Sequence, residues 1–320
     1  TMLILYIKLL AMFLSAYGSI NLLLSEKIKD KLRIKSKFRY FIKEKDLITK
    51  ATDKATLEDI EVYKWGFKAT LDISRVCSYE DIEKHSDYLK QMFRAKEVRM
   101  INKKGTVEIE VFNKDVGDIK YEYVDMSPYE LIFGYNKKGE PITVNMKKTP
   151  HIGVQGASNS GKSKMIELAL RNVKNKADVI MLNCFEDDFI SIPGRRINNN
   201  EDILEYLESI IEEPYIRERP LYLLLDELNV LGKDKKINKA IMDVLAQARH
   251  FNIFLIALGQ SLLKENCPYK QLFNVRVTFR AIDRSSISAF LGCTVEDTRL
   301  NQREFICYSD SIYRGKSYLL

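Results

Sequence analysis

The sequence feature that most constrains this chain is a glycine-rich segment at residues 151–163. Gly156, Gly161, Lys162 and Ser163 complete the pattern G-x-x-x-x-G-K-S. Apolar residues typical of a buried strand precede the pattern, and a helix-forming sequence follows it. A phosphate-binding loop requires this order of strand, loop and helix. The glycines allow backbone N–H groups to point at a phosphate, and the helix N-terminus adds partial positive charge there.

We expect this loop to bind ATP together with Mg²⁺. Lys162 is expected to reach the β- and γ-phosphates, and the hydroxyl of Ser163 to ligate Mg²⁺. The expected nucleotide-binding residues are Gly156, Ala157, Ser158, Asn159, Ser160, Gly161, Lys162, Ser163 and Lys164. The alternative is a glycine- and serine-rich loop without a ligand, which the complete pattern and its context disfavour.

A pair of carboxylates supplies the second half of the expected site. Residues 221–225 form an apolar run, consistent with a strand buried in a parallel sheet, and Asp226 and Glu227 follow it. ATP hydrolysis needs an acid beside Mg²⁺ and a group that orients the attacking water. We expect Asp226 to join Ser163 at the metal and Glu227 to polarise the water. The alternative is an acidic strand end without a catalytic role.

Apolar runs alternate with helical patterns over residues 126–320, which we expect to form one ATPase domain. Residues 177–184 and 253–258 are strand-like, whereas residues 201–213 and 237–250 have helical spacing. This alternation predicts an α/β domain with a mostly parallel sheet and right-handed crossovers.

Polar residues near two later strands are further catalytic candidates. Gln260 directly follows a strand, where it could sense the γ-phosphate. Arg276 and Arg280 flank another strand, and an arginine can act in trans on the γ-phosphate of a neighbouring subunit. Arg284 is a third candidate for the same role, and Arg249 is a weaker one. Each arginine also has a simpler interpretation as a surface or structural residue.

Residues 61–125 are expected to form a small α+β domain before the ATPase domain. Alternating apolar residues at 67–73 predict a half-buried strand, and Ser78 to Asp81 resembles a helix capping box. Two further strands joined by residues 102–105 have the chemistry of a hairpin. The expected order is β–α–β–β, without a catalytic constellation.

Residues 2–24 are almost continuously apolar, and about 20 such residues suffice to span a bilayer as a helix. We expect residues 1–25 to be a membrane anchor and residues 26–60 to be a basic linker. Residues 26–50 carry ten Lys or Arg against four Asp or Glu, and a basic flank marks the cytoplasmic side. The prediction is a single-pass protein of the cell membrane with a cytoplasmic ATPase domain. The alternative is an amphipathic or core helix in a cytoplasmic protein.

Charge and cysteine content narrow the class of protein further. The net charge of +7 is compatible with a nucleic-acid or anionic-membrane partner. The five cysteines include no C-x-x-C pair, which disfavours a disulfide framework or a zinc site and favours a reducing compartment.

The motifs together resemble the FtsK/SpoIIIE–HerA family of ring-shaped DNA-translocating ATPases. The segments that carry the resemblance are Pro150-His151, Leu223 to Glu227, Gln247 to Gln260 and Arg276 to Arg280, with Gly66 to Val111 resembling the small domain that precedes the motor. The resemblance covers roughly residues 60–320. One departure is Ala-Leu-Gly-Gln-Ser at residues 257–261, where the family usually has Ala-Thr-Gln-Arg.

The resemblance implies a RecA-like P-loop fold, a homo-hexameric ring and ATP-driven movement of double-stranded DNA. Lysines in channel loops would follow phosphates without reading bases, and the candidates are Lys233, Lys235, Lys236 and Lys264. The alternative for this lysine cluster is a solvated loop. A short, membrane-anchored motor looks most like the coupling or transfer ATPases of Gram-positive mobile elements. Such a role would involve a relaxase or a secretion channel as partner.

Two alternatives of different classes remain open from the sequence. The first is a motor for another polymer, such as a phage-assembly ATPase or a single-stranded DNA motor. The second is a membrane adaptor that binds nucleotide as a switch and recruits a relaxase or secretion channel. Asp226 and Glu227 argue against the adaptor, because a switch does not need hydrolytic carboxylates.

Overall fold

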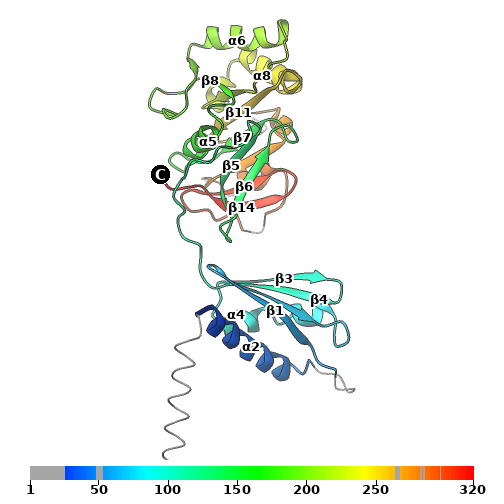
Figure 1. Cartoon of the computed structure of the whole chain (residues 1–320). Coiled ribbons are helices and arrows are strands. Elements are labelled where there is room, and N and C mark those ends of the chain that lie inside the picture. The colour runs from blue at the N-terminus through cyan, green and yellow to red at the C-terminus, as the bar shows by residue number, and fades with distance from the viewer. Residues whose placement is uncertain (1–25, 48–52, 264–266, 282, 284, 296) are drawn as a thin grey trace, which may run out of the picture. The chain divides into compact units, whose positions relative to one another are not determined.

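The computed structural model describes residues 26–47, 53–263, 267–281, 283, 285–295 and 297–320. The chain divides between Val116 and Gly117 into two compact units, which are described separately (Figure 1). The expected anchor at residues 2–24 lies outside the described residues. Among the helices that are described, none has the length and apolar character needed to cross a bilayer.

The first unit is an antiparallel sheet with helices packed on one face (Figure 1). Its elements are α2 (Glu26–Glu44), β1 (Thr56–Tyr63), β2 (Gly66–Asp72), α3 (Tyr79–Glu83), α4 (Ser86–Phe93), β3 (Glu97–Lys103) and β4 (Thr106–Phe112). The strands pair in the order β1-β2-β4-β3. The predicted capping box begins α3, because the N–H of Asp81 donates to Oγ of Ser78 over 3.3 Å.

The segment at residues 26–60 differs from the basic linker that the sequence suggests. It contains α2 and much of β1, and α2 buries Phe38 and Phe41 completely in the core of the unit. Ile34 and Ile42 lie on the same buried stripe. Most of the exposed residues of the helix are charged, so the overall composition conceals a buried apolar stripe with helical period.

The second unit is built on a ten-stranded mixed sheet. Its elements are β5 (Glu130–Tyr135), β6 (Pro141–Asn145), β7 (Ile152–Gln155), α5 (Lys162–Arg171), β8 (Asp178–Leu182), β9 (Arg195–Ile197), α6 (Asn200–Glu212), β10 (Leu221–Leu225), α7 (Leu228–Leu231), α8 (Lys235–Gln247), η1 (Ala248–Phe251), β11 (Ile253–Gly259), η2 (Lys270–Leu272), β12 (Val275–Thr278), α9 (Ser285–Leu291), β13 (Glu304–Tyr308) and β14 (Ile312–Lys316). The strand order is β6-β5-β14-β13-β12-β7-β11-β10-β8-β9.

The strands from β12 to β9 in this order are parallel, as the alternation of strands and helices predicts. The remaining strands, β13, β14, β5 and β6, extend the sheet with antiparallel pairing. The mostly parallel α/β fold is therefore confirmed, with an antiparallel addition that the sequence did not indicate.

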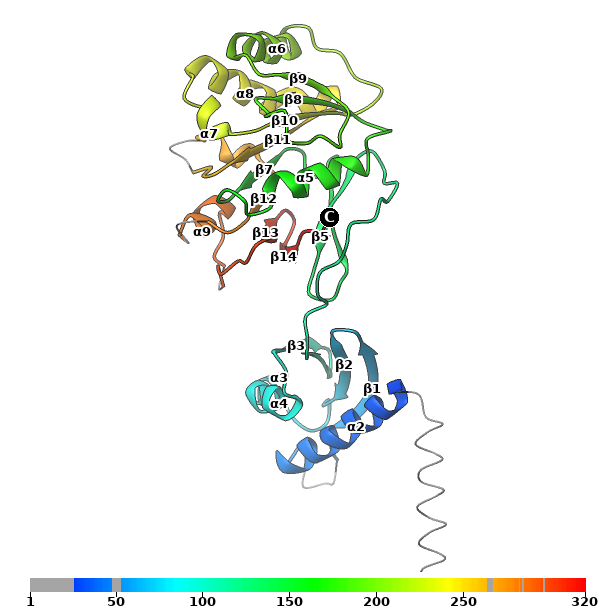
Figure 2. The same ribbon diagram turned by 90° about the vertical axis from the view of Figure 1, so that its left-hand side faces the viewer.

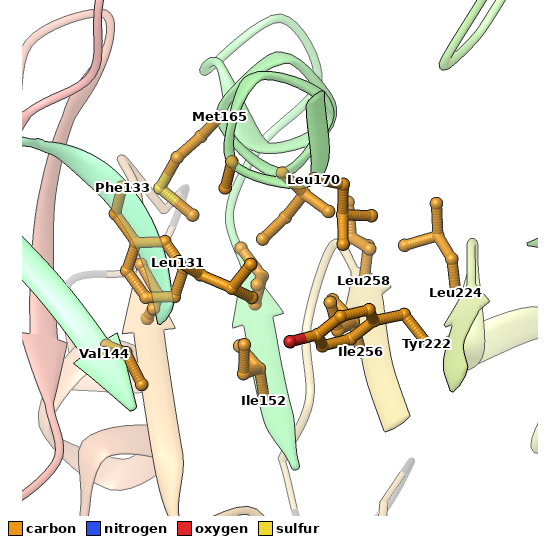
Figure 3. Packing of buried hydrophobic residues seen from close by; sticks show 14 of the residues in the cluster. Leu131, Phe133, Val144, Ile152, Met165, Leu170, Tyr222, Leu224, Ile256 and Leu258 are labelled. Carbon is orange, nitrogen blue, oxygen red and sulfur yellow. The ribbon is translucent and has the colours of Figure 1, made fainter. Parts of the chain in front are cut away.

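Helices cover both faces of the parallel strands. On one face, Met165 and Leu170 of α5 are directed at a core that includes Ile256 and Leu258 of β11 (Figure 3). On the other face, α6 and α8 lie side by side over the alternate residues of β10 and β11 (Figure 2). All five residues of β10 are buried, as expected for a strand covered on both faces.

The first and last segments of the second unit are joined to each other. Lys120 and Leu319 form a parallel bridge. The N–H of Tyr121 donates to the carbonyl of Leu319 over 2.7 Å, and the N–H of Leu319 donates to the carbonyl of Ile119 over 2.9 Å. Asp118 also accepts Nζ of Lys316 at 2.6 Å. These contacts fix residues 118–121, which enter the second unit, to residues 316–319 near the end of the chain.

Candidate nucleotide-binding and hydrolysis site

The candidate site lies where the parallel strands end. Gln155, the last residue of β7, pairs with Gly259 of β11 and with Thr278 of β12. The loop at residues 156–163 therefore begins between the carboxyl ends of two neighbouring strands. In open α/β sheets this edge is where ligands bind.

The geometry of the loop requires its glycines. Gly156 has a φ of 152°, and a Cβ at this position would lie 2.7 Å from Cβ of Phe279. Gly161 has a φ of 112° and forms the N-cap of α5. The loop is held from both sides, because the N–H of Gly156 donates to Gly259 and the N–H of Ala157 donates to the carbonyl of Arg280.

Lys162 is folded into the curve of this loop. Its Nζ donates to the carbonyls of Gly156 and Ala157 over 2.7 and 3.1 Å. Burial lowers the pKa of Lys162, whereas the carboxylates of Asp226 and Glu227 oppose that change. The ammonium is thus positioned inside the loop and within the electrostatic reach of both expected catalytic acids.

Asp226 is a buried carboxylate, with 7% of its surface exposed. Burial raises the pKa of Asp226 to about 6, and the nearby charges of Glu227 and Asp188 act in the same direction. The N–H of Glu227 donates to Oδ1 of Asp226 over 2.9 Å, which favours the ionised form. Asn183 fixes the backbone by donating to the carbonyl of Asp226 over 3.1 Å.

The donor chemistry fits Mg²⁺ bound together with a nucleotide. Ser163 in the first turn of α5 and Asp226 offer hard oxygen ligands, the type that Mg²⁺ prefers. Within the described ranges, no group of three or more His, Cys, Asp or Glu side chains could hold a metal alone. Two protein oxygens completed by phosphate oxygens and water match the usual binding of Mg²⁺.

Glu227 stands at a bend between β10 and α7. Its φ of 49° is left-handed, a conformation uncommon in residues other than glycine and concentrated at functional sites. The carbonyl of Glu227 accepts the N–H of Val230 over 2.7 Å. The bend places this carboxylate directly after Asp226, at the same sheet edge as the loop.

The structure identifies Gln155 as a positioning residue that the sequence analysis missed. Its side chain is 1% exposed, and its Nε2 donates to Oγ1 of Thr278 and to the carbonyl of Ser286. Its Oε1 accepts the N–H of Leu262 over 3.2 Å. The available signal was a polar residue closing an apolar strand directly before the phosphate loop.

Gln260 is exposed at the end of β11, and its N–H donates to Oδ1 of Asn229 over 3.2 Å. The strand register thus brings Gln260 to the edge that holds the phosphate loop. Asn229, in α7 after the acid pair, was not singled out from the sequence. The role of Gln260 as a sensor of the γ-phosphate remains a prediction.

The candidate arginines lie in different environments. Arg276 donates from Nη1 to the carbonyls of Phe290 and Leu291, so its guanidinium caps the end of α9. Arg280 is exposed just beyond β12. Arg249 lies in η1, at the opposite edge of the sheet from the loop. Arg284 and Lys264 lie outside the described residues.

Arg303 also contacts the phosphate loop, and the sequence analysis missed it. Its N–H donates to the carbonyl of Ser160 over 2.9 Å, and its backbone packs beside Gly161. Its guanidinium forms an ion pair with Asp118 at 2.6 Å. Because Asp118 also accepts Lys316, this cluster connects the phosphate loop to the segment through which the chain enters the unit.

His151 lies directly before β7, at the opposite end of that strand from the phosphate loop, and has a structural role. Its Nδ1 accepts the N–H of Leu255 over 3.0 Å, which fixes the start of β7 against β11. Burial lowers the pKa of His151 to about 4, with the charge of Arg249 acting in the same direction. The imidazole is therefore neutral near pH 7 and serves as a hydrogen-bond acceptor in the sheet.

A glycine-rich loop between a parallel strand and a helix, with an acid pair at the same sheet edge, defines a P-loop NTPase. Comparisons with known proteins show which P-loop NTPases this chain resembles. No family model matches the chain. The chain is 34% identical over 104 residues to DNA translocase SftA of Bacillus subtilis, covering 29% of this chain and 11% of the relative. It is 28% identical over 156 residues to DNA translocase FtsK of Leptospira interrogans, covering 45% of this chain and 16% of the relative.

Solved structures share the fold. The pCW3 conjugation coupling protein TcpA, in its monomer form with ATPγS, is similar at a TM-score of 0.58 and 15% identity, covering 88% of this chain and 94% of that chain. ATPases 2 and 3 of EssC from Geobacillus thermodenitrificans are similar at a TM-score of 0.51 and 11% identity, covering 63% and 46%. The expected resemblance to FtsK-type DNA translocases is confirmed, although the match spans a small part of the curated relatives.

Proposed function

We propose that this chain is an ATP-driven motor that moves double-stranded DNA, in the transfer of a mobile genetic element. The observation that carries the proposal is that the phosphate loop after β7 and the Asp226 and Glu227 pair after β10 lie at the same edge of the parallel sheet. The similarity to SftA, FtsK and TcpA supports DNA as the polymer and conjugation as the setting.

The residues of the site divide the work of hydrolysis. The backbone of residues 156–163 and Lys162 would bind the phosphates, and Ser163 and Asp226 would hold Mg²⁺, whose positive charge would offset the negative charge of the phosphates. Glu227 orients and polarises the attacking water. Gln155 and Arg303 keep the loop in place from β12 and from the chain that follows α9.

The active assembly in this proposal is a homo-hexameric ring with ATP bound between subunits. Arg280 is the better candidate for a residue that acts on the neighbour's γ-phosphate, because Arg276 is engaged with carbonyls of α9. The exposed lysines Lys233, Lys235 and Lys236 flank the start of α8 and would contact DNA phosphates without reading sequence.

Membrane attachment completes the proposal. Residues 2–24 would anchor the chain in the cell membrane with the ATPase unit in the cytoplasm, because a long apolar run precedes a basic segment. An anchored motor can pass DNA to a secretion channel or accept it from a relaxase. The similarity in fold to a conjugation coupling protein supports conjugation as the setting for these proposed partners.

The test is ATP hydrolysis by the full chain with duplex DNA, single-stranded DNA or no DNA. Duplex DNA is expected to stimulate hydrolysis most, and Lys162→Ala and Glu227→Gln to abolish it. Glu212→Gln, which neutralises an exposed acid at the end of α6, is the matched control and keeps full activity.

Other outcomes separate the alternatives. Equal or stronger stimulation by single strands would assign the motor to that polymer. Nucleotide binding without turnover would identify a switch-like adaptor instead of an enzyme. DNA-stimulated hydrolysis that survives Lys162→Ala or Glu227→Gln would contradict the proposed mechanism.

A further inference from the structure

The outward face of α2 carries large apolar side chains in a row. Ile28, Leu32 and Tyr40 are 45%, 55% and 57% exposed. They are separated by four and eight residues, and Ser36 occupies the intermediate position. Residues four apart lie on one side of an α-helix, so these side chains share one row, which Ser36 interrupts between Leu32 and Tyr40. This row is called the stripe below. The stripe faces away from Phe38 and Phe41, which are buried in the core.

Cations flank this stripe on both sides. At 100° per residue, Lys31, Lys35, Arg39 and Lys43 follow one border of the stripe, whereas Lys29, Arg33 and Lys37 follow the other. The second row is engaged, because Lys29 pairs with Glu26, Arg33 pairs with Asp30, and Lys37 donates to the carbonyl of Met92. Over the part of the chain that the structure describes, no carboxylate forms an ion pair with the first row.

The first row borders a cationic groove between α2 and β1. Lys35, Arg39 and Lys43 line a cavity of about 650 Å³ together with Lys54 from the chain before β1. Leu57 contributes to its apolar wall. A neighbouring cavity of about 310 Å³ lies farther along the helix and is mixed in charge, because Lys31 and Lys35 line it together with Glu58 and Asp59 of β1. The purely cationic part of the groove is therefore the larger cavity. The larger cavity, with four cations and an apolar wall, can accept an anionic group with an attached apolar chain.

We propose that this face of α2 lies on the surface of an anionic lipid bilayer. A helix that binds in the plane of a membrane presents apolar residues between Lys and Arg, and the cations contact lipid phosphates. DNA fits this face less well, because contacts to its phosphate backbone give no reason to expose Ile28 and Leu32 beside the cations. The apolar residues 2–24 directly precede α2 in the sequence, which would bring the helix to the membrane.

The inference rests on the proposed membrane attachment and is independent of ATP hydrolysis. It is tested with the full chain reconstituted in vesicles whose phosphatidylcholine carries brominated acyl chains, with or without phosphatidylglycerol. Leu32→Trp reports on α2, and Tyr215→Trp is the control at a position 60% exposed in the second unit. Trp65 is the one tryptophan of the sequence and is buried, so it contributes the same background to both variants.

Bromine is expected to quench the tryptophan at position 32 in vesicles with phosphatidylglycerol and to leave position 215 unchanged. Each cation near an anionic surface strengthens contact about fivefold. Lys35→Gln with Arg39→Gln should therefore weaken the contact about twenty-fivefold and remove most of the quenching. Lys103→Gln with Lys104→Gln removes the same charge at exposed positions of the β3–β4 turn and should have no effect.

The proposal is overturned if quenching is equal at positions 32 and 215, equal with and without phosphatidylglycerol, or unchanged in the Lys35 and Arg39 variant. It is also overturned if duplex DNA, and not lipid, changes the fluorescence at position 32, since that result would assign the face to nucleic acid. ATP hydrolysis by the same samples separates the two proposals. Loss of quenching with normal DNA-stimulated hydrolysis refutes the lipid contact alone, whereas normal quenching without hydrolysis refutes the motor alone.

Discussion

At the scale of single residues, the proposed role of Asp226 as a ligand of Mg²⁺ conflicts with its buried environment. The fold removes this carboxylate from water, yet a metal ligand has to be ionised. Burial raises its pKa to about 6 from the usual value of 3.8. The unliganded protein therefore carries a destabilising charge at neutral pH, which bound Mg²⁺ would compensate.

The first prediction concerns Asp226→Asn in the absence of nucleotide. A raised carboxyl pKa means that the folded state binds the proton more tightly, so stability falls as pH rises from about 4 through about 6. Asp226→Asn should abolish hydrolysis and increase the free energy of unfolding by on the order of 2 kcal/mol at pH 8. Chemical denaturation at pH 8 and pH 5 measures this gain, which should shrink at pH 5.

Asp187→Asn is the control for this prediction, because Asp187 is exposed on the loop after β8. It should leave both hydrolysis and the pH dependence of stability unchanged. A stability gain of Asp226→Asn that is equal at both pH values would show that the burial of the charge is not its cause.

The second prediction concerns the space beside Gly156. Gly156→Ala would place a methyl group 2.7 Å from Cβ of Phe279 at a φ of 152°. The loop has to shift, so affinity for a non-hydrolysable ATP analogue should fall at least tenfold in calorimetry. Gly117→Ala is the control, because it also has a positive φ but would meet no atom within 4 Å. Gly117→Ala should cost about 1 kcal/mol of stability and leave nucleotide affinity intact.

At the scale of elements, the sequence predicted best those parts whose signals are local. The phosphate loop, the acid pair after β10 and the capping box of α3 each depend on a few adjacent residues. Gln155, Asn183 and Arg303 were missed, because their partners lie on segments distant in the sequence. A pattern within one segment cannot reveal such contacts.

The antiparallel extension of the sheet was missed for a related physical reason. β13 and β14 are short strands whose stability comes from pairing with β12 and β5. Only one residue pair, Lys316 with Tyr135, joins β14 to β5 in the ladder. Register and pairing of this kind depend on distant segments, so the period of the individual strands is a weak signal.

The third prediction tests α2 as a core element of the first unit. Phe38 is fully buried and contacts the rings of Phe67 and Phe93. Phe38→Ala should lower the free energy of unfolding of this unit by about 3 to 5 kcal/mol, because it removes a large side chain from the core. Hydrogen exchange of β2 and β4 measures the effect. Tyr40→Ala changes an exposed neighbour on the same helix and should leave that exchange unchanged in the absence of lipid.

At the scale of the whole molecule, the proposed site extends over two subunits. The fourth prediction is that Arg280→Ala and Glu227→Gln are each inactive but recover part of the ATPase activity when mixed. In a mixed ring, some interfaces combine an intact Glu227 from one subunit with an intact Arg280 from its neighbour. Activity of the mixture against its ratio measures this recovery. A mixture that stays inactive would place Arg280 outside the neighbour's site.

The fifth prediction concerns the proposed anchor. The full chain should resist extraction from membranes by alkaline carbonate, because a spanning apolar segment stays in the bilayer. The chain without residues 1–25 should be extracted by carbonate, and any remaining attachment through α2 should be released by high salt. Extraction of the full chain by carbonate would exclude a spanning segment.

Arg303 gives the second unit a direct path for mechanical load. Its backbone N–H donates to the carbonyl of Ser160 in the phosphate loop, and its guanidinium forms an ion pair with Asp118 of the entering chain. Leu319 bonds the same chain on both sides of Lys120, in a parallel bridge. Tension along the entering chain would therefore load these bonds in shear, where they resist together instead of opening one after another. When the proposed motor pulls on DNA, the reaction force at the ATP site would pass through Arg303 to Asp118. From there it would pass along the entering chain toward the proposed membrane anchor.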